Sequence, residues 1–132
     1  MKNRSTPMND ELTSNIIKAA FNVYNELGTG FLEKVYHNAM IIELQLMGFK
    51  VESVYPIPVF YKGNLVGNYN ADLFVEDELI VELKAVENTV KAHEVQLVNY
   101  LQGTGNEIGL LINFGRSVEI KRKYRTYKSP KV

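Results

Sequence analysis

Two carboxylates and one lysine interrupt two segments that are otherwise hydrophobic. Asp72 stands in the first segment, and Glu82 and Lys84 stand two residues apart in the second. If both segments are strands, Glu82 and Lys84 share a face, because side chains alternate between faces along a strand. Such a face can bind a divalent cation and stabilise charge on a phosphoryl oxygen, which is typical of phosphodiester hydrolysis. The alternative is an ordinary ion pair on an exposed strand.

The length of the turn between the two segments decides whether Asp72 joins this face. A two-residue turn would place Asp72 opposite Leu83, whereas a three-residue turn at residues 76–78 places it opposite Glu82. We predict the three-residue turn. Two facing carboxylates repel each other, so this arrangement favours a cation between them, and a hard divalent ion such as Mg²⁺ suits carboxylate oxygens.

With these residues in view, the sequence resembles the PD-(D/E)xK nuclease superfamily over about residues 12–123. Asp72 followed by Glu82-x-Lys84 between hydrophobic strands is similar to the core motif of that superfamily. Ala71 stands where the motif has its proline, a departure that the superfamily tolerates. The resemblance implies a restriction-endonuclease-like fold, in which a mixed β-sheet is flanked by helices.

Two further motifs support the resemblance. Residues 30–36 read G-x-x-E-x-x-Y, the signature for which the GxxExxY protein family is named. Gln96 and Tyr100 resemble the Q-x-x-x-Y element of RecB-like nucleases. Residues four apart share a helix face, so these two side chains could look toward the strand carboxylates or form a polar pair on a wet surface.

The resemblance also implies a site and a cofactor, one or two Mg²⁺ or Mn²⁺ ions. The implied metal ligands are the oxygen donors Glu33, Asp72, Glu82 and the backbone carbonyl of Leu83. The residues implied in catalysis are Glu33, Asp72, Glu82, Lys84, Gln96 and Tyr100. Within this set Lys84 would be the catalytic cation and Gln96 would orient the site. Glu33 also has a simple local explanation, because a carboxylate at a helix start complements the helix dipole.

The composition fits one domain over residues 1–132, with a core at about 9–125. The 132 residues are 45% hydrophobic and carry a formal net charge of zero, which suits a single packed core rather than a polycation. The chain has no cysteine, so disulfides, thiolate nucleophiles and cysteine-bound metals are excluded. It shows no apolar leader and no apolar run of roughly 18 residues. We therefore expect a soluble, cytoplasmic protein that does not enter a membrane.

The charges are nevertheless unevenly distributed. Residues 116–132 form a basic C-terminal tail of net charge +6, and residues 1–115 carry −6. A basic segment beside an acidic centre suits a phosphate-binding surface next to a metal site, although a solvated tail has the same composition. The candidate nucleic-acid-binding residues are Arg116, Lys121, Arg122, Lys123 and Arg125.

Hydrophobic periodicity predicts an α/β (α+β) fold with the order αα-βββ-α-ββ. The expected helices cover about residues 10–27, 32–46 and 93–101, and the expected strands cover about 51–61, 65–75, 79–85, 108–113 and 118–121. Pro56 and Pro58 place the first strand at an edge or in an irregular segment. The third helix crosses over one face, so the strand that follows it can lie parallel to an earlier one.

The two histidines and several tyrosines carry weaker signals of a site. His37 and His93 lack the spacing of a zinc site, and we assign them no catalytic role, only surface or capping positions. Tyr55, Tyr61 and Tyr69 could stack on bases or pack on the sheet.

Taken together, these observations predict an enzyme, a Mg²⁺-dependent nuclease that hydrolyses phosphodiester bonds, with DNA as substrate. One alternative is a catalytically silent nuclease-fold module that binds nucleic acid or a protein partner. Another is a small-molecule phosphoesterase, which the basic tail favours less. Because the chain offers little area for holding a duplex, a homodimer or a larger partner protein is also expected.

Overall fold

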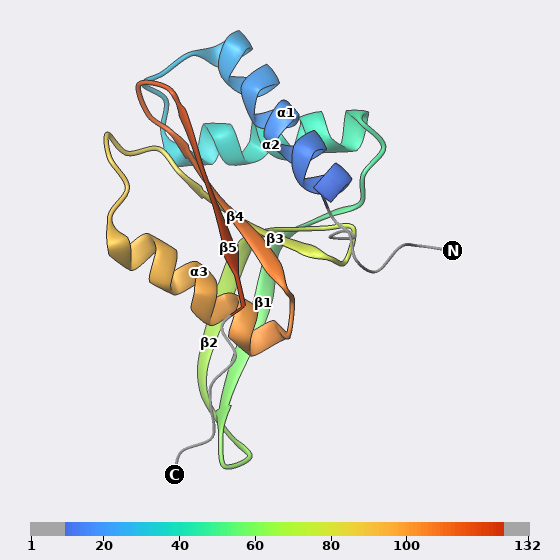
Figure 1. The fold of residues 1–132 in the computed structure, drawn as a ribbon, viewed down its shortest axis with the longest axis vertical. Helices are drawn as coiled ribbons and strands as arrows, with labels where there is room; N and C mark the ends of the chain where they lie inside the picture. Colours follow the sequence, from blue (N-terminus) through green and yellow to red (C-terminus); the bar gives the residue numbers. More distant parts are fainter. Residues whose placement is uncertain (1–9, 126–132) are drawn as a thin grey trace.

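The computed structural model describes residues 10–125, which form three helices and five strands (Figure 1). The helices are α1 (Asp10–Leu27), α2 (Glu33–Leu46) and α3 (Lys91–Thr104). The strands are β1 (Val51–Tyr61), β2 (Asn64–Val75), β3 (Leu79–Lys84), β4 (Ile108–Phe114) and β5 (Val118–Tyr124). The predicted order αα-βββ-α-ββ is confirmed. Among the described residues, no helix is both long and apolar enough to cross a membrane.

Helices α1 and α2 form the expected helical hairpin. In α1 the buried apolar side chains recur every three or four residues, at Leu12, Ile16, Ala19, Ala20 and Val23, which gives the helix one apolar face. Gly28 follows with a φ of 75°, and its N–H donates to the Tyr24 carbonyl at 2.7 Å. Glycine adopts this left-handed conformation without strain, so the helix ends here.

The five strands form one mixed sheet in the order β1-β2-β3-β4-β5. Neighbouring strands are antiparallel except β3 and β4, which are parallel and are connected through α3, as parallel strands require. Strand β1 lies at an edge, as Pro56 and Pro58 predicted. In β1 the backbone of Val54 has a φ of 55°, an unusual conformation for a β-branched residue.

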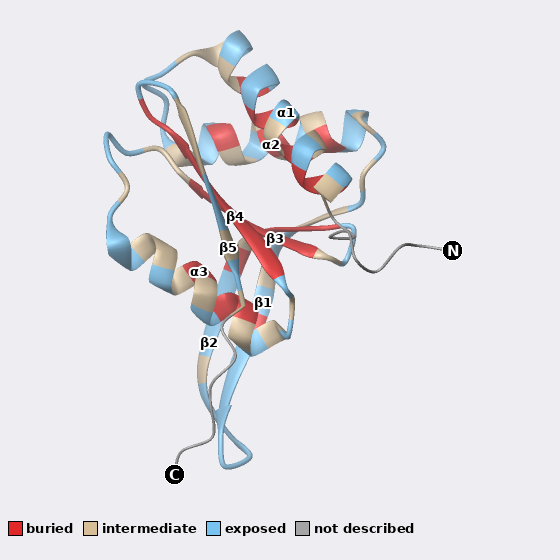
Figure 2. Cartoon of the chain, in the orientation of Figure 1, coloured by how far each residue is buried: buried red, intermediate tan, exposed pale blue. Residues whose placement is uncertain are grey.

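The two faces of the sheet pack against different helices. Leu73 and Val81 belong to the cluster that also contains the buried residues of α1 and α2. Phe74 and Ile80, one position along each strand, belong to a second cluster with α3. Figure 2 shows the buried residues concentrated in the central strands. Because faces alternate along a strand, Glu82 lies on the α3 side.

Strands β1 and β2 extend beyond the rest of the sheet as a long hairpin (Figure 1). Strand β2 pairs with β3 through Leu73, Phe74 and Val75, while β1 and β2 stay paired as far as Tyr61 and Asn64. We call residues 57–69 the β1–β2 arm. All side chains from 58 to 66 are exposed, so the outer part of the arm does not rest on the core, whereas Ile57 at its base is buried against α3.

The segment predicted as a basic tail is structured over its first part. Strand β5 takes up Val118–Tyr124 and pairs antiparallel with β4. Residues 126–132, which include Lys128 and Lys131, lie outside the described residues.

Candidate active site

Asp72 and Glu82 lie side by side at the point where β2 and β3 part. Residues 76–78 form the turn between the strands, and Leu73 pairs with Val81 in the antiparallel ladder. The same register sets Asp72 opposite Glu82. The predicted three-residue turn is therefore confirmed, and with it the common face of the two carboxylates.

Two hydrogen bonds that cross between the strands hold these carboxylates in place. The N–H of Asp72 donates to Glu82 Oε1 at 2.8 Å, and the N–H of Leu83 donates to Asp72 Oδ2 at 2.7 Å. The bonds satisfy backbone donors beyond the last ladder pair, where the strands separate. Asp72 Oδ1 and Glu82 Oε2 take no part in this exchange, so each carboxylate keeps a second oxygen for another ligand.

Burial makes both carboxylates difficult to ionise, and the charge of Asp72 adds to this at Glu82. Glu82 is 4% exposed, and its pKa is raised to about 8, first by burial and then by the charge of Asp72. Burial also raises the pKa of Asp72, against the N–H of Leu83, which lowers it. At neutral pH the pair therefore carries less than its full negative charge unless a cation lies beside it.

Glu33 approaches the same acids from α2. It is the first residue of the helix, where the helix dipole favours a carboxylate. Partial burial raises the pKa of Glu33 and the charge of Asp72 raises it further, while the charges of Lys84 and both histidines lower it. Glu33 is thus within electrostatic range of the Asp72–Glu82 pair.

Tyr36, the last residue of the G-x-x-E-x-x-Y motif, has a structural role. It is fully buried, its hydroxyl donates to the Gly28 carbonyl at 2.6 Å, and its ring stacks on Phe114 of β4 with the centroids 4.5 Å apart. These contacts fix the start of α2 against the sheet. They thereby hold Glu33 near the strand acids.

Lys84 follows Glu82 on the same face, at the end of β3, and is half-buried. Its charge lowers the pKa values of Glu33, Asp72 and Glu82. Lys84 is therefore a cation that acts on all three acids.

His37 is a residue of this site to which the sequence analysis gave no role. Its Nδ1 lies 4.0 Å from Asp72 Oδ1, and its Nε2 lies 2.9 Å from Ser53 Oγ. Its four-residue spacing from Glu33 on one helix face was the available signal. His93, in contrast, is a capping residue as expected, because its Nδ1 accepts the N–H of the residue before α3 at 3.2 Å.

Tyr100 of α3 is within electrostatic range of both acids, and Gln96 is bonded to it. Gln96 Nε2 donates to the Tyr100 hydroxyl at 2.9 Å, which confirms that they share a helix face. The pKa of Tyr100 is raised to about 12, first by burial and then by the charges of Glu82 and Asp72. The phenol therefore stays protonated and can donate a hydrogen bond in the site.

The donor set suits a hard divalent cation. Carboxylate and carbonyl oxygens are the ligands that Mg²⁺ and Mn²⁺ prefer. Burial is the main cause of the raised pKa values of Asp72 and Glu82, and a cation beside them would favour their ionised forms. Between residues 10 and 125, however, no group of three or more His, Cys, Asp or Glu side chains is close enough together to hold a metal ion. The structure brings Asp72 and Glu82 together and leaves Glu33 as a more distant neighbour.

Each of the five basic residues predicted to bind nucleic acid lies beside an acid of the same chain. The pairs and their N–O distances are Arg116–Glu87 at 3.1 Å, Lys121–Glu94 at 3.5 Å, Arg122–Asp10 at 3.8 Å, Lys123–Glu94 at 3.0 Å and Arg125–Glu107 at 3.3 Å. A phosphate would therefore compete with these carboxylates for the basic side chains.

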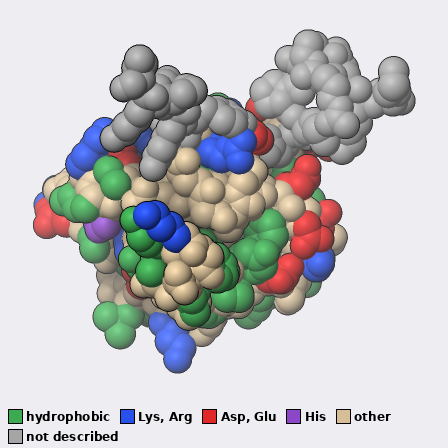
Figure 3. Space-filling model, turned by 90° about the horizontal axis from the view of Figure 1, so that it is seen from below, with side chains coloured by type: hydrophobic (Ala, Val, Ile, Leu, Met, Phe, Trp, Pro, Cys, Tyr) green, Lys and Arg blue, Asp and Glu red, His purple; other side chains and the backbone are tan. Residues whose placement is uncertain are grey.

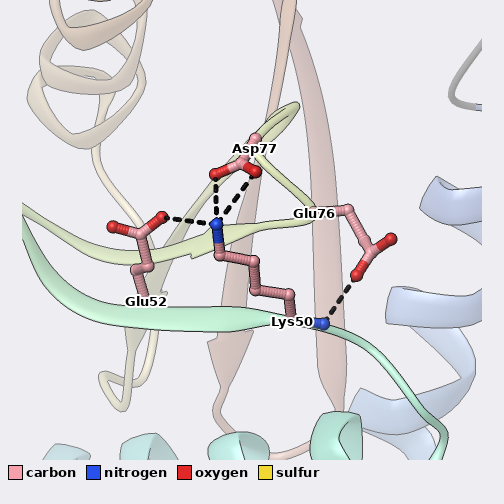
Figure 4. Close-up of polar contacts among 4 residues, drawn as sticks. All are labelled: Lys50, Glu52, Glu76 and Asp77. Carbon is pink, nitrogen blue, oxygen red and sulfur yellow. Dashed lines mark hydrogen bonds and ion pairs between the residues drawn. The ribbon is translucent and has the colours of Figure 1, made fainter.

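A second acidic cluster lies at the other end of the β2–β3 hairpin, around its turn (Figure 4). Lys50 Nζ is 3.0 Å from Asp77 Oδ2 and 3.7 Å from Glu52 Oε1, and the Lys50 N–H donates to Glu76 Oε2 at 2.6 Å. Glu76 and Asp77 have φ values of 54° and 55°, so these contacts hold two residues in an uncommon left-handed conformation. Because the turn sets the register, this cluster helps to place Asp72 opposite Glu82.

Comparison with known proteins identifies the family. The sequence model of the PD-(D/E)XK nuclease superfamily matches residues 10–125, which include every residue of the candidate site. The chain belongs to this superfamily. Its assignment to the GxxExxY family within it stays a prediction. A search of the curated proteins finds no match to this sequence.

The fold is shared with a solved structure titled "Crystal structure of SSO0001", with 16% sequence identity and a TM-score of 0.59. The match covers 91% of this chain and 60% of that chain, so this chain spans about 60% of the length of that relative. The mixed five-stranded sheet flanked by three helices between residues 10 and 125 is consistent with the predicted restriction-endonuclease-like α+β fold.

Proposed function

We propose that this chain is a cytoplasmic, metal-dependent nuclease that hydrolyses phosphodiester bonds in DNA. The observation that carries the proposal is the Asp72–Glu82 pair, in which Glu82 is buried, Asp72 is partly buried, and both are held by backbone N–H groups, with Lys84 near both acids. An arrangement that opposes the ionisation of two adjacent acids lowers the stability of the fold unless a bound cation offsets it. Membership of the nuclease superfamily supports the same function.

Asp72 and Glu82 would hold Mg²⁺ or Mn²⁺, together with the Leu83 carbonyl and Glu33. When bound, the ion supplies Lewis-acid chemistry, which draws charge from a phosphate and lowers the pKa of a water molecule. Lys84 would place its ammonium group against charge that grows on a phosphoryl oxygen. Gln96 and the protonated Tyr100 hydroxyl would orient the reacting groups from α3.

The basic residues from Arg116 to Arg125 would contact the substrate backbone. Phosphates would replace Glu87 and Asp10, because exposed ion pairs contribute little and exchange readily. The partly buried Lys123–Glu94 pair would cost more to separate. A steep fall of DNA affinity with rising salt is therefore expected. A second copy of the chain or a larger partner protein would extend this surface along a duplex.

A second function, a nuclease-fold module that binds nucleic acid or a protein without cleaving it, is favoured by one observation. In the described part of the chain no three acidic or histidine side chains converge on a common point. Such a module would bind DNA with a steep salt dependence and yield no products in Mg²⁺ or Mn²⁺.

The test is a cleavage assay with purified protein, labelled single- and double-stranded DNA, and Mg²⁺, Mn²⁺ or a chelator. We expect products that require the metal and that disappear in Glu82→Ala and in Lys84→Ala, with both variants folded by circular dichroism. Metal-dependent cleavage that persists unchanged in either variant would contradict the assigned roles. Turnover of mononucleotides with inert DNA would instead indicate a small-molecule phosphoesterase.

A further inference from the structure

A cavity of about 280 Å³ opens between α3 and the β1–β2 arm, beside the candidate active site. Apolar side chains of the arm form one wall, and α3 supplies polar groups to the other. The lining residues on which the argument rests are Ile57, Val59, Tyr69, Gln96, Asn99 and Tyr100. The cavity thus combines apolar surface, aromatic rings and side-chain amides.

The ring of Tyr69 is available to a ligand. Tyr69 is 51% exposed, and its ring centroid lies 5.9 Å from that of Tyr100 at an interplanar angle of 44°. The two rings are tilted rather than stacked in parallel, so the face of Tyr69 is not covered by Tyr100. An exposed ring of this kind can stack on a planar heterocycle.

Two amides offer hydrogen bonds in the same cavity. An amide presents both donors and an acceptor, as does the edge of a nucleobase. Gln96 is oriented by its bond to the Tyr100 hydroxyl, while Asn99 lies one turn away on the same lining. A ring for stacking and amides for the edge match a planar polar base better than an aliphatic side chain.

The cavity is continuous with the candidate active site through its own residues. Gln96 and Tyr100 line the cavity and belong to the candidate site. Tyr69 precedes Asp72 by three residues on β2, roughly 10 Å along the strand. This separation is on the scale of a few nucleotides of one strand.

We propose that this cavity binds one unpaired base of a single-stranded nucleic acid, held by stacking on Tyr69 and by the amides of Asn99 and Gln96. The inference rests on the proposed nuclease function and specifies its substrate as a strand with an unpaired base near the cleaved bond. A base inside a duplex has both faces stacked and its edge paired, so it reaches such a cavity only after it leaves the stack.

The outer end of the β1–β2 arm provides an internal control. Seen from below, hydrophobic side chains gather around this end (Figure 3). Tyr61 belongs to this end and is 62% exposed, but it does not line the cavity. Substitution of Tyr61 thus removes a comparable ring from the same arm without altering the proposed binding site.

The experiment measures the affinity of a labelled single-stranded oligonucleotide by fluorescence anisotropy, in a chelator so that nothing is cleaved. We expect Tyr69→Ala to weaken binding roughly tenfold, the usual effect of losing one base–aromatic stack. Tyr69→Phe and Tyr61→Ala should bind like the wild type. The affinity for a blunt duplex should be the same in the wild type and in Tyr69→Ala.

Three results would overturn the proposal: no binding of the single strand by wild type, equal affinity of wild type and Tyr69→Ala, or an equal loss in Tyr61→Ala. A wild-type dimer that Tyr69→Ala converts to a monomer in sedimentation would assign the cavity to a second copy instead, which also overturns it. Cleavage in Mg²⁺ separates the two proposals. Tyr69-dependent binding without cleavage refutes the nuclease alone, and cleavage without Tyr69-dependent binding refutes the cavity alone.

Discussion

Strands β2 and β3 carry an acidic cluster at each end of their hairpin, and the two clusters have opposite electrostatics. At the turn, Asp77 is exposed and its pKa is lowered by a hydrogen bond from Lys50 (Figure 4). At the open end, Glu82 is buried and its pKa is raised to about 8 by burial and by Asp72. The same residue types thus ionise easily in one place and with difficulty in the other.

The difference separates a structural use of acids from a functional one. A carboxylate in solvent beside an ammonium group stabilises a turn at little cost. Two adjacent carboxylates that burial and repulsion keep from ionising lower the stability of the fold, which supports the proposal that they bind a cation. The three-residue turn sets the register, and the register places Asp72 opposite Glu82.

The largest expected effect is on catalysis. Glu82→Gln keeps the shape of the side chain but removes its charge, and we expect Mg²⁺-dependent cleavage to fall by at least about a hundredfold. Asp77→Asn makes the same change in the turn cluster and should leave the cleavage rate within about twofold of wild type. Rates are compared on one DNA substrate at equal protein concentration. Equal losses of cleavage in the two variants would show that the two acidic clusters do not differ in function.

A second effect is expected on stability as a function of pH. The pKa of Glu82 is about 8 in the folded chain against 4.5 ordinarily, so its folded form retains the proton more tightly. The contribution of Glu82 to the free energy of unfolding is fully present below about pH 4.5 and is lost as the pH rises through about 8. Since one pKa unit corresponds to about 1.4 kcal/mol, we expect the free energy of unfolding of metal-free protein to fall by a few kcal/mol across this range.

The control for this experiment is Glu82→Gln. Urea unfolding at a series of pH values should show that the difference between wild type and Glu82→Gln grows as the pH rises from about 5 to about 8. Parallel curves would show that Glu82 does not titrate as described.

The smallest effect, with the opposite sign, is expected at the turn. Because the pKa of Asp77 is lowered, its contribution to the free energy of unfolding is present above about pH 4 and is lost as the pH falls through the pKa of the folded form. The raised pKa of Lys50 means that its contribution is lost only at strongly alkaline pH. Lys50→Met should therefore lower the melting temperature slightly at neutral pH, less than the Glu82 effect. High salt should abolish the difference between Lys50→Met and wild type, because this pair is exposed; a difference that persists in salt would indicate a buried role.

Much of the fold followed from the sequence because its signals are local. Helical spacing in α1, the closing glycine and the alternation around Glu82 each depend on residues near one another in the chain. The three-residue turn was predictable because only the register that it sets brings Asp72 and Glu82 opposite each other, where they could bind one cation. The limits of β5, which extends past the predicted Lys121 to Tyr124, depend on pairing with β4, a contact between distant segments that its own residues do not encode.

The parts of the site that the sequence did not predict likewise depend on contacts between segments that are distant in the chain. His37 contacts Asp72 because α2 packs beside β1 and β3, and a histidine on a helix carries no sign of that neighbour. The ion pairs of Lys121 and Lys123 with Glu94 likewise join β5 to α3, so these lysines read as a free basic segment in the sequence alone. The cavity beside Tyr69 exists because α3 crosses the sheet next to the β1–β2 arm.

The central claim is that Asp72 and Glu82 share a divalent cation. Calorimetric titration of Mn²⁺ into wild type and into Asp72→Ala tests it most directly, with Asp77→Ala as the matched control and circular dichroism to confirm that each protein is folded. The account predicts stoichiometric binding by wild type and by Asp77→Ala and its loss in Asp72→Ala. Unchanged Mn²⁺ affinity in folded Asp72→Ala, or no binding by wild type, would contradict it.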